Sequence, residues 1–76
     1  MKIIMVTQKG CVKCDAAKTR LGDKLRKVEV VDAIEHPEVI KKYGLEGSTP
    51  FFILDSGDGF FEVFKSVIFI EKYLLE

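Results

Sequence analysis

The sequence predicts a single α/β domain over residues 1–76, with a four-stranded mixed sheet flanked by helices. Three observations predict this class. Apolar, strand-like runs alternate along the chain with stretches of helical pattern, which is typical of α/β proteins. A glycine-rich turn separates the last two expected strands, so these strands should pair antiparallel. The apolar content of 47% is that of a folded globule and not of a disordered chain.

The first half of the chain predicts two strand–helix units. The first strand covers about residues 2–7, and the first helix covers about residues 12–25. The second strand covers residues 28–32, and the short return between the two strands favours a parallel pair. A second helix begins at Pro37, because proline is favoured at the first helical position, and Gly44 is a natural stop.

The second half predicts a hairpin followed by a helix. The continuous apolar run of residues 51–54 is typical of a central strand that is covered on both faces. Residues 55–59 form a turn, and residues 60–64 form the antiparallel partner strand at the edge of the sheet. Ser66 can cap a last helix that extends to about Leu75.

Charge and hydropathy exclude several classes of function. Twelve basic side chains balance twelve acidic ones, so charge gives no reason to expect nucleic acid or an anionic membrane as a partner. No apolar run approaches the ~20 residues that a membrane helix needs. Residues 8–10 end the first apolar stretch too early for a signal peptide, so we expect a cytoplasmic protein. In that compartment, a close pair of cysteines is more often catalytic or metal-binding than structural.

The two cysteines follow the first strand and Gly10, at the start of the first helix. Free N–H groups and the helix dipole favour negative charge there, so the Cys11 thiol should have a lowered pKa and react as a nucleophile. Cys14 lies one helical turn further on the same face and can attack a mixed disulfide formed at Cys11. The cation of Lys13 would lower the Cys11 pKa further if it faces the sulfur, and would be screened if it points into solvent.

The order of these features resembles the thioredoxin-like superfamily. The resemblance rests on a strand, a Cys-x-x-Cys motif that opens a helix, and Thr49-Pro50 before a late apolar strand. It covers the whole sequence, and the size is closest to that of glutaredoxins. Residues 42–51 also look like the thioredoxin stretch that ends at the cis-proline. The resemblance implies a thioredoxin-like fold of order β-α-β-α-β-β-α and the activity of a thiol–disulfide oxidoreductase.

The resemblance also implies a role for each site residue. Cys11 would be the attacking thiol and Cys14 the resolving thiol of a redox-active disulfide. Pro50 would be the cis-proline that faces this disulfide, and the Thr49 backbone would pair with an extended substrate peptide or with glutathione. The substrate would be a disulfide-containing protein or a small thiol, with Lys13 beside it. We expect a monomer without a bound cofactor, because the electrons reside in the cysteines.

The electron donor stays open between two classes. Val12 and Lys13 differ from the Gly-Pro of typical thioredoxins and from the Pro-Tyr of typical glutaredoxins. The glycine pair that helps glutaredoxins hold glutathione is replaced near residues 64–66. A flavoprotein of the thioredoxin-reductase type is therefore at least as good a candidate as glutathione.

Metal handling is the alternative hypothesis. Two thiolates suit Cu(I), so a soft-metal chaperone is possible on chemical grounds, as is a glutaredoxin-like protein that bridges an iron–sulfur cluster between two chains. Small copper chaperones carry a methionine just before the motif, where this chain has Lys9-Gly10, and they end in a strand. We interpret His36 as a helix-start residue and Asp32 as a solvated strand-end residue, not as catalytic groups.

Overall fold

Four strands form the middle layer of the structure, a computed structural model that describes residues 1–74. They are β1 (Lys2–Thr7), β2 (Glu29–Asp32), β3 (Phe51–Asp55) and β4 (Phe61–Phe64). β1 pairs parallel with β2 and antiparallel with β3, and β3 pairs antiparallel with β4. The order across the sheet is therefore β2-β1-β3-β4, which confirms the predicted α/β class and mixed sheet.

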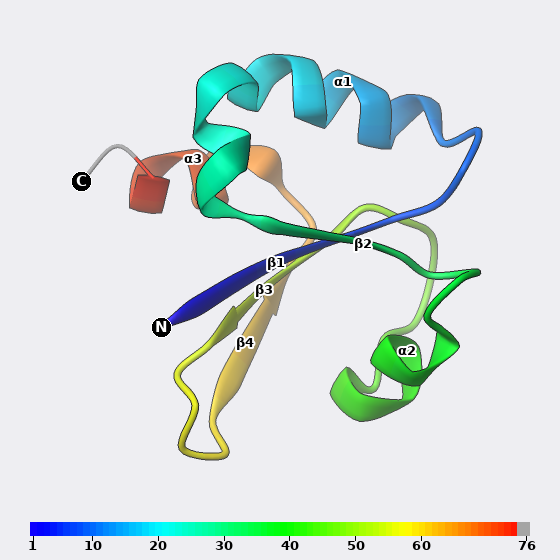
Figure 1. The fold of residues 1–76 in the computed structure, drawn as a ribbon, viewed down its shortest axis with the longest axis vertical. Helices are drawn as coiled ribbons and strands as arrows, with labels where there is room; N and C mark the ends of the chain where they lie inside the picture. Colours follow the sequence, from blue (N-terminus) through cyan, green and yellow to red (C-terminus); the bar gives the residue numbers. More distant parts are fainter. Residues whose placement is uncertain (75–76) are drawn as a thin grey trace.

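Three α-helices cover the two faces of this sheet (Figure 1). α1 (Val12–Leu21) and α3 (Val67–Leu74) lie on one face, and α2 (Pro37–Tyr43) lies on the other. The predicted end of the last helix near Leu75 lies outside the described residues. Among residues 1–74, no helix combines the length and the apolar character needed to cross a membrane.

The first helix is shorter than predicted, and the element order changes with it. α1 ends because Gly22 has φ +54°, a conformation that glycine adopts at little cost, and its N–H donates back to the Lys18 carbonyl. A 3-10 helix, η1 (Gly22–Lys27), follows before β2. The observed order is thus β-α-η-β-α-β-β-α, and the single helix predicted over residues 12–25 is wrong beyond Leu21.

The core consists of two clusters, one on each face of the sheet. Successive strand residues point to opposite faces. Phe52 and Leu54 therefore pack against α1 and α3, whereas Phe51 and Ile53 face α2. The cluster under α1 and α3 also contains the Cys14 side chain.

A buried tyrosine fastens α2 to the sheet. The Tyr43 hydroxyl donates to Asp55 Oδ2 over 2.7 Å, and its ring packs edge-on against Phe61 at 4.9 Å. Burial raises the pKa of Tyr43 to about 12. The hydrogen bond from Tyr43 in turn holds the pKa of the Asp55 carboxyl below its usual value.

Candidate functional site

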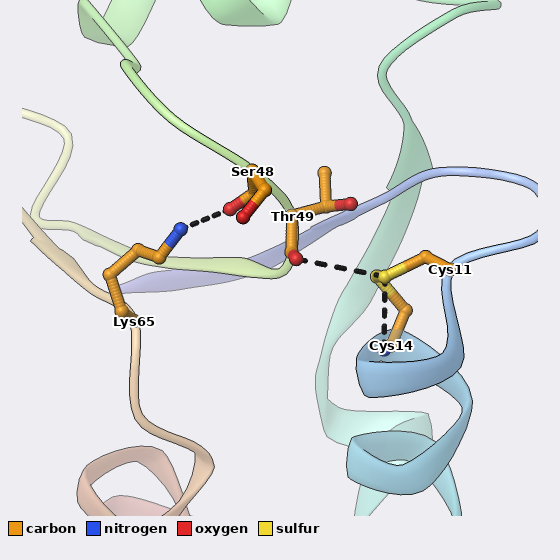
Figure 2. The surroundings of a disulfide bond; sticks show 5 residues. All are labelled: Cys11, Cys14, Ser48, Thr49 and Lys65. Carbon is orange, nitrogen blue, oxygen red and sulfur yellow. Dashed lines mark hydrogen bonds between the residues drawn. A yellow bond between two sulfur atoms is a disulfide. The ribbon is translucent and has the colours of Figure 1, made fainter.

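Cys11 and Cys14 form a disulfide at the start of α1, just after the turn that follows β1 (Figure 2). The chain turns at Gly10, which has φ +82°, and the Cys11 N–H donates to the Gln8 carbonyl over 3.0 Å. The two Cα atoms are 5.2 Å apart, within the usual range for a disulfide. Cys11 is the N-cap of α1 and Cys14 lies in its first turn, so the predicted position at the helix N-terminus is confirmed.

The two cysteines differ in their accessibility. The Cys11 side chain is partly exposed, whereas Cys14 is only 1% exposed and packs in the core with Met5, Phe52 and Ile70. A large substrate can therefore reach the Cys11 sulfur but not the Cys14 sulfur. The roles of attacking and resolving thiol stay predictions for these two residues.

The start of the helix supplies a hydrogen bond to the outer sulfur. The backbone N–H of Cys14 donates to Cys11 Sγ over 3.1 Å. An N–H in this position would favour the negatively charged form of the sulfur in the reduced protein. The helix dipole acts in the same direction.

A second segment, 38 residues along the chain, meets the disulfide. The Thr49 carbonyl oxygen lies 3.6 Å from Cys11 Sγ, and a reduced Cys11 thiol can donate to it (Figure 2). The Thr49–Pro50 peptide bond is cis, and both side chains are buried. The structure thus brings together Cys11, Cys14, Thr49 and Pro50, as the sequence resemblance implies.

Thr49 lies in a bend two residues before β3, outside the pairing of β3 with β1. That pairing begins at Phe51, opposite Val6, so Thr49 has no neighbouring strand. Within residues 1–74, the Thr49 N–H makes no hydrogen bond. It borders a shallow hollow of about 330 Å³, which is lined by residues 8–13 on one side and residues 48–49 on the other. An extended chain placed in this hollow could accept a hydrogen bond from Thr49.

An apolar groove lies beside the disulfide, between α1 and the start of α3. Its volume is about 570 Å³ and Pro50 is part of its wall. Its apolar lining comes from Ala16, Ala17, Pro50, Val67 and Ile68, and its cations are Lys13, Arg20 and Lys65. The Arg20 guanidinium is engaged by Glu71, through distances of 3.1 and 3.3 Å. The groove can take an apolar side chain of a substrate bound at Cys11.

Two other charged residues that the sequence singles out, Lys13 and Asp32, lie in different surroundings. Lys13 is exposed and borders both the hollow and the groove, which leaves its effect on Cys11 a prediction. Asp32 Oδ1 accepts from the Ile34 N–H over 2.7 Å and from the Glu35 N–H over 3.2 Å. The bond from Ile34 is the main reason why the pKa of Asp32 is lowered, so this carboxylate is a weak proton acceptor.

The sequence analysis did not predict the contribution of Lys65 and of the first residues of α3. Lys65 donates to the Ser48 carbonyl, and Val67 and Ile68 line the groove. No local pattern connects residue 65 with residue 48, because only the folded sheet brings them together. The one available signal is the cation placed where the resemblance predicts a glycine.

Comparisons with protein-family models, with curated proteins and with solved structures found no match. The chemistry of the site therefore carries the functional argument. Its two sulfurs can exchange electrons as a dithiol or hold a soft cation such as Cu(I).

Proposed function

We propose that this protein is a thioredoxin-like thiol–disulfide oxidoreductase. One observation carries the proposal: an accessible sulfur at a helix N-terminus is joined to a buried sulfur one turn further on. A structural disulfide has no need of a partly exposed sulfur that also receives a backbone N–H. An exchange reaction needs both features, because the thiolate is the attacking species and must be reached.

The proposed reaction takes place in two steps. The Cys11 thiolate attacks one sulfur of the substrate disulfide, that disulfide breaks, and the departing substrate thiolate takes a proton from solvent. Cys14 then loses its proton and attacks Cys11 Sγ, which closes the Cys11–Cys14 disulfide and releases the second substrate thiol. The protein loses two electrons and two protons, and the substrate gains them.

The surroundings of the sulfurs support a peptide-like substrate. An extended backbone can pair with Thr49 in the hollow, while a side chain beside the substrate cysteine enters the groove. Disulfide-containing proteins or small peptidic thiols fit this arrangement. Reduction of the Cys11–Cys14 disulfide then requires a two-electron donor, either glutathione or a flavoprotein of the thioredoxin-reductase type.

The redox equilibrium of the cysteine pair tests the proposal. The protein is equilibrated in glutathione and in dithiothreitol buffers of graded potential, alkylated, and analysed by mass. We expect one reversible two-electron transition between the dithiol and the intramolecular disulfide. A pair that never closes to the disulfide would contradict the dithiol mechanism. Titration with Cu(I) would then test the metal-binding alternative.

A further inference from the structure

A lysine on the far side of the site holds the backbone that faces the cysteines. Lys65 lies between β4 and α3, and its ammonium donates to the carbonyl oxygen of Ser48 (Figure 2). The same ammonium lies 4.3 Å from the centre of the Phe51 ring. Lys65 is exposed, and these two contacts place its ammonium between the first residue of β3 and the segment that precedes it.

The Ser48 carbonyl and the Thr49 N–H belong to one peptide group. This bond is trans, since the cis bond in this segment is the next one, Thr49–Pro50. A trans peptide is planar, and its C=O and N–H point in opposite directions. A carbonyl held by Lys65 therefore fixes the direction of the Thr49 N–H. A cation on the oxygen also polarises the peptide group, which makes its N–H a stronger donor.

The neighbouring peptide group explains why this direction matters. The Thr49 carbonyl lies 3.6 Å from Cys11 Sγ, so the Thr49 backbone is already in contact with the reacting sulfur. Its N–H has no partner within the part of the chain that the structure describes. A donor that is oriented, polarised and unpaired beside the attacking sulfur is suited to bind the backbone carbonyl of a substrate.

We propose that Lys65 is a positioning residue that selects substrates with a peptide backbone. It acts through the Ser48–Thr49 peptide group, and it also lines the groove beside the disulfide. The proposal rests on the proposed oxidoreductase function and narrows its substrate class. Disulfides within peptides and proteins benefit from Lys65, whereas disulfides without an amide do not.

Two other roles for Lys65 make different predictions. A long-range effect of its charge on the Cys11 thiolate would change the reaction with every disulfide to a similar extent. A purely structural role would lower stability without discriminating between substrates. Only the positioning role predicts that a substitution of Lys65 slows the reaction with an amide-containing disulfide more than the reaction with a disulfide that has no amide.

The test uses three variants of the full chain. Lys65→Met keeps an apolar stem over Phe51 but removes the donor, and Lys65→Arg keeps both the charge and the donor. Lys72→Met is the matched control, because Lys72 also lies over a phenylalanine ring, 5.8 Å from the centre of Phe69. Each protein is reduced, freed of reductant and mixed with one of two probes. The probes are a capped peptide that contains a disulfide, and bis(2-hydroxyethyl) disulfide, which has no amide.

The rate of protein oxidation is followed by acid quench and alkylation. We expect Lys65→Met to react about three- to tenfold more slowly with the peptide, the effect of weakening the one hydrogen bond from Thr49 to the substrate backbone. With the hydroxyethyl probe, its rate should stay within about twofold of that of the parent protein. Lys65→Arg should restore the peptide rate, and Lys72→Met should leave both rates unchanged. The proposal would be overturned if Lys65→Met and the parent protein reacted with the peptide at the same rate. It would also be overturned if Lys65→Met lost the same factor in rate with both probes.

A spectroscopic readout does not depend on activity. The amide nitrogen of Thr49 shares a peptide group with the Ser48 carbonyl, so its chemical shift should move in Lys65→Met and return toward the parent value in Lys65→Arg. An unmoved Thr49 resonance would overturn the proposal even if the rates changed. If Lys65→Met does not fold, Lys65→Leu, which also lacks a donor, replaces it in both experiments. A parent protein that reacts with neither probe would instead contradict the proposed function.

Discussion

The backbone N–H of Cys14 donates to the Cys11 sulfur over 3.1 Å, so the inner cysteine supports the outer one before any exchange takes place. This support comes from the main chain and does not require the Cys14 thiol. The two roles of Cys14, as a hydrogen-bond donor and as the proposed resolving thiol, can therefore be separated by substitution.

Substitution of each cysteine should give different products. Cys14→Ser keeps the N–H that faces Cys11, so Cys11 should still attack and should accumulate as a mixed disulfide with the substrate, seen by mass as a covalent adduct. Cys11→Ser should lower the rate of disulfide reduction by at least about a hundredfold, because the nucleophile is lost. Full activity in Cys11→Ser would show that the assignment of the two cysteines is wrong.

The groove between α1 and α3 should bind substrate side chains. Ile68 lines this groove and is 50% exposed, so Ile68→Asn can alter its surface at little cost to folding. We expect the KM for a peptide disulfide to rise about fivefold with little change in kcat. Val30→Asn is the control, because Val30 is 43% exposed but lies on β2, outside the groove. An equal effect of both substitutions would argue against the groove.

The stability of the fold around Cys14 should depend on the buried ring of Phe52. Phe52 is completely buried and packs in the same cluster as Cys14, so Phe52→Ala should lower the free energy of unfolding by about 3–5 kcal/mol. Phe60 is 76% exposed, and Phe60→Ala should change the free energy of unfolding by no more than about 0.5 kcal/mol. Urea unfolding followed by circular dichroism measures both values. Similar losses in the two variants would contradict the described core.

The hydrogen bond between Tyr43 and Asp55 should contribute to the loss of folding stability at acid pH. The pKa of Asp55 is lower in the folded protein than the usual value of an aspartate, mainly because of the hydrogen bond from Tyr43. The folded state therefore favours the ionised carboxylate, and the resulting stability is present above about pH 5 and is lost as the pH falls below about 4. In Asp55→Asn the melting temperature should fall less steeply with acid.

A control carboxyl makes this pH experiment specific. Asp23 is exposed in η1 and makes no side-chain hydrogen bond within residues 1–74. Asp23→Asn should leave the slope of melting temperature against pH unchanged. The pKa values of Asp32 and Asp58 are also lowered, by backbone and serine donors respectively, so part of the acid limb should remain in Asp55→Asn. Identical slopes in all three proteins would rule out the Tyr43–Asp55 contribution.

Local patterns were sufficient for most of the elements. Pro37 and Gly44 mark the ends of α2, because one residue fits the first turn and the other takes the left-handed conformation with φ +60°. The apolar run at residues 51–54 correctly predicts a central strand covered on both faces. The end of α1 was mispredicted, because Gly22 terminates the helix at once instead of weakening it, and η1 carries the chain to β2.

The sequence alone determined that the two cysteines lie at a helix N-terminus, since strand, turn and helix follow each other within residues 2–21. Tertiary structure decided everything that depends on contacts between distant segments. Pairing of β1 with β3 brings Thr49 to Cys11, and the position of the chain after β4 brings Lys65 to Ser48. Burial of Cys14 likewise arises from packing against β3 and α3. Sequence periodicity encodes which face of an element is apolar, but not which distant backbone group lies opposite a given side chain.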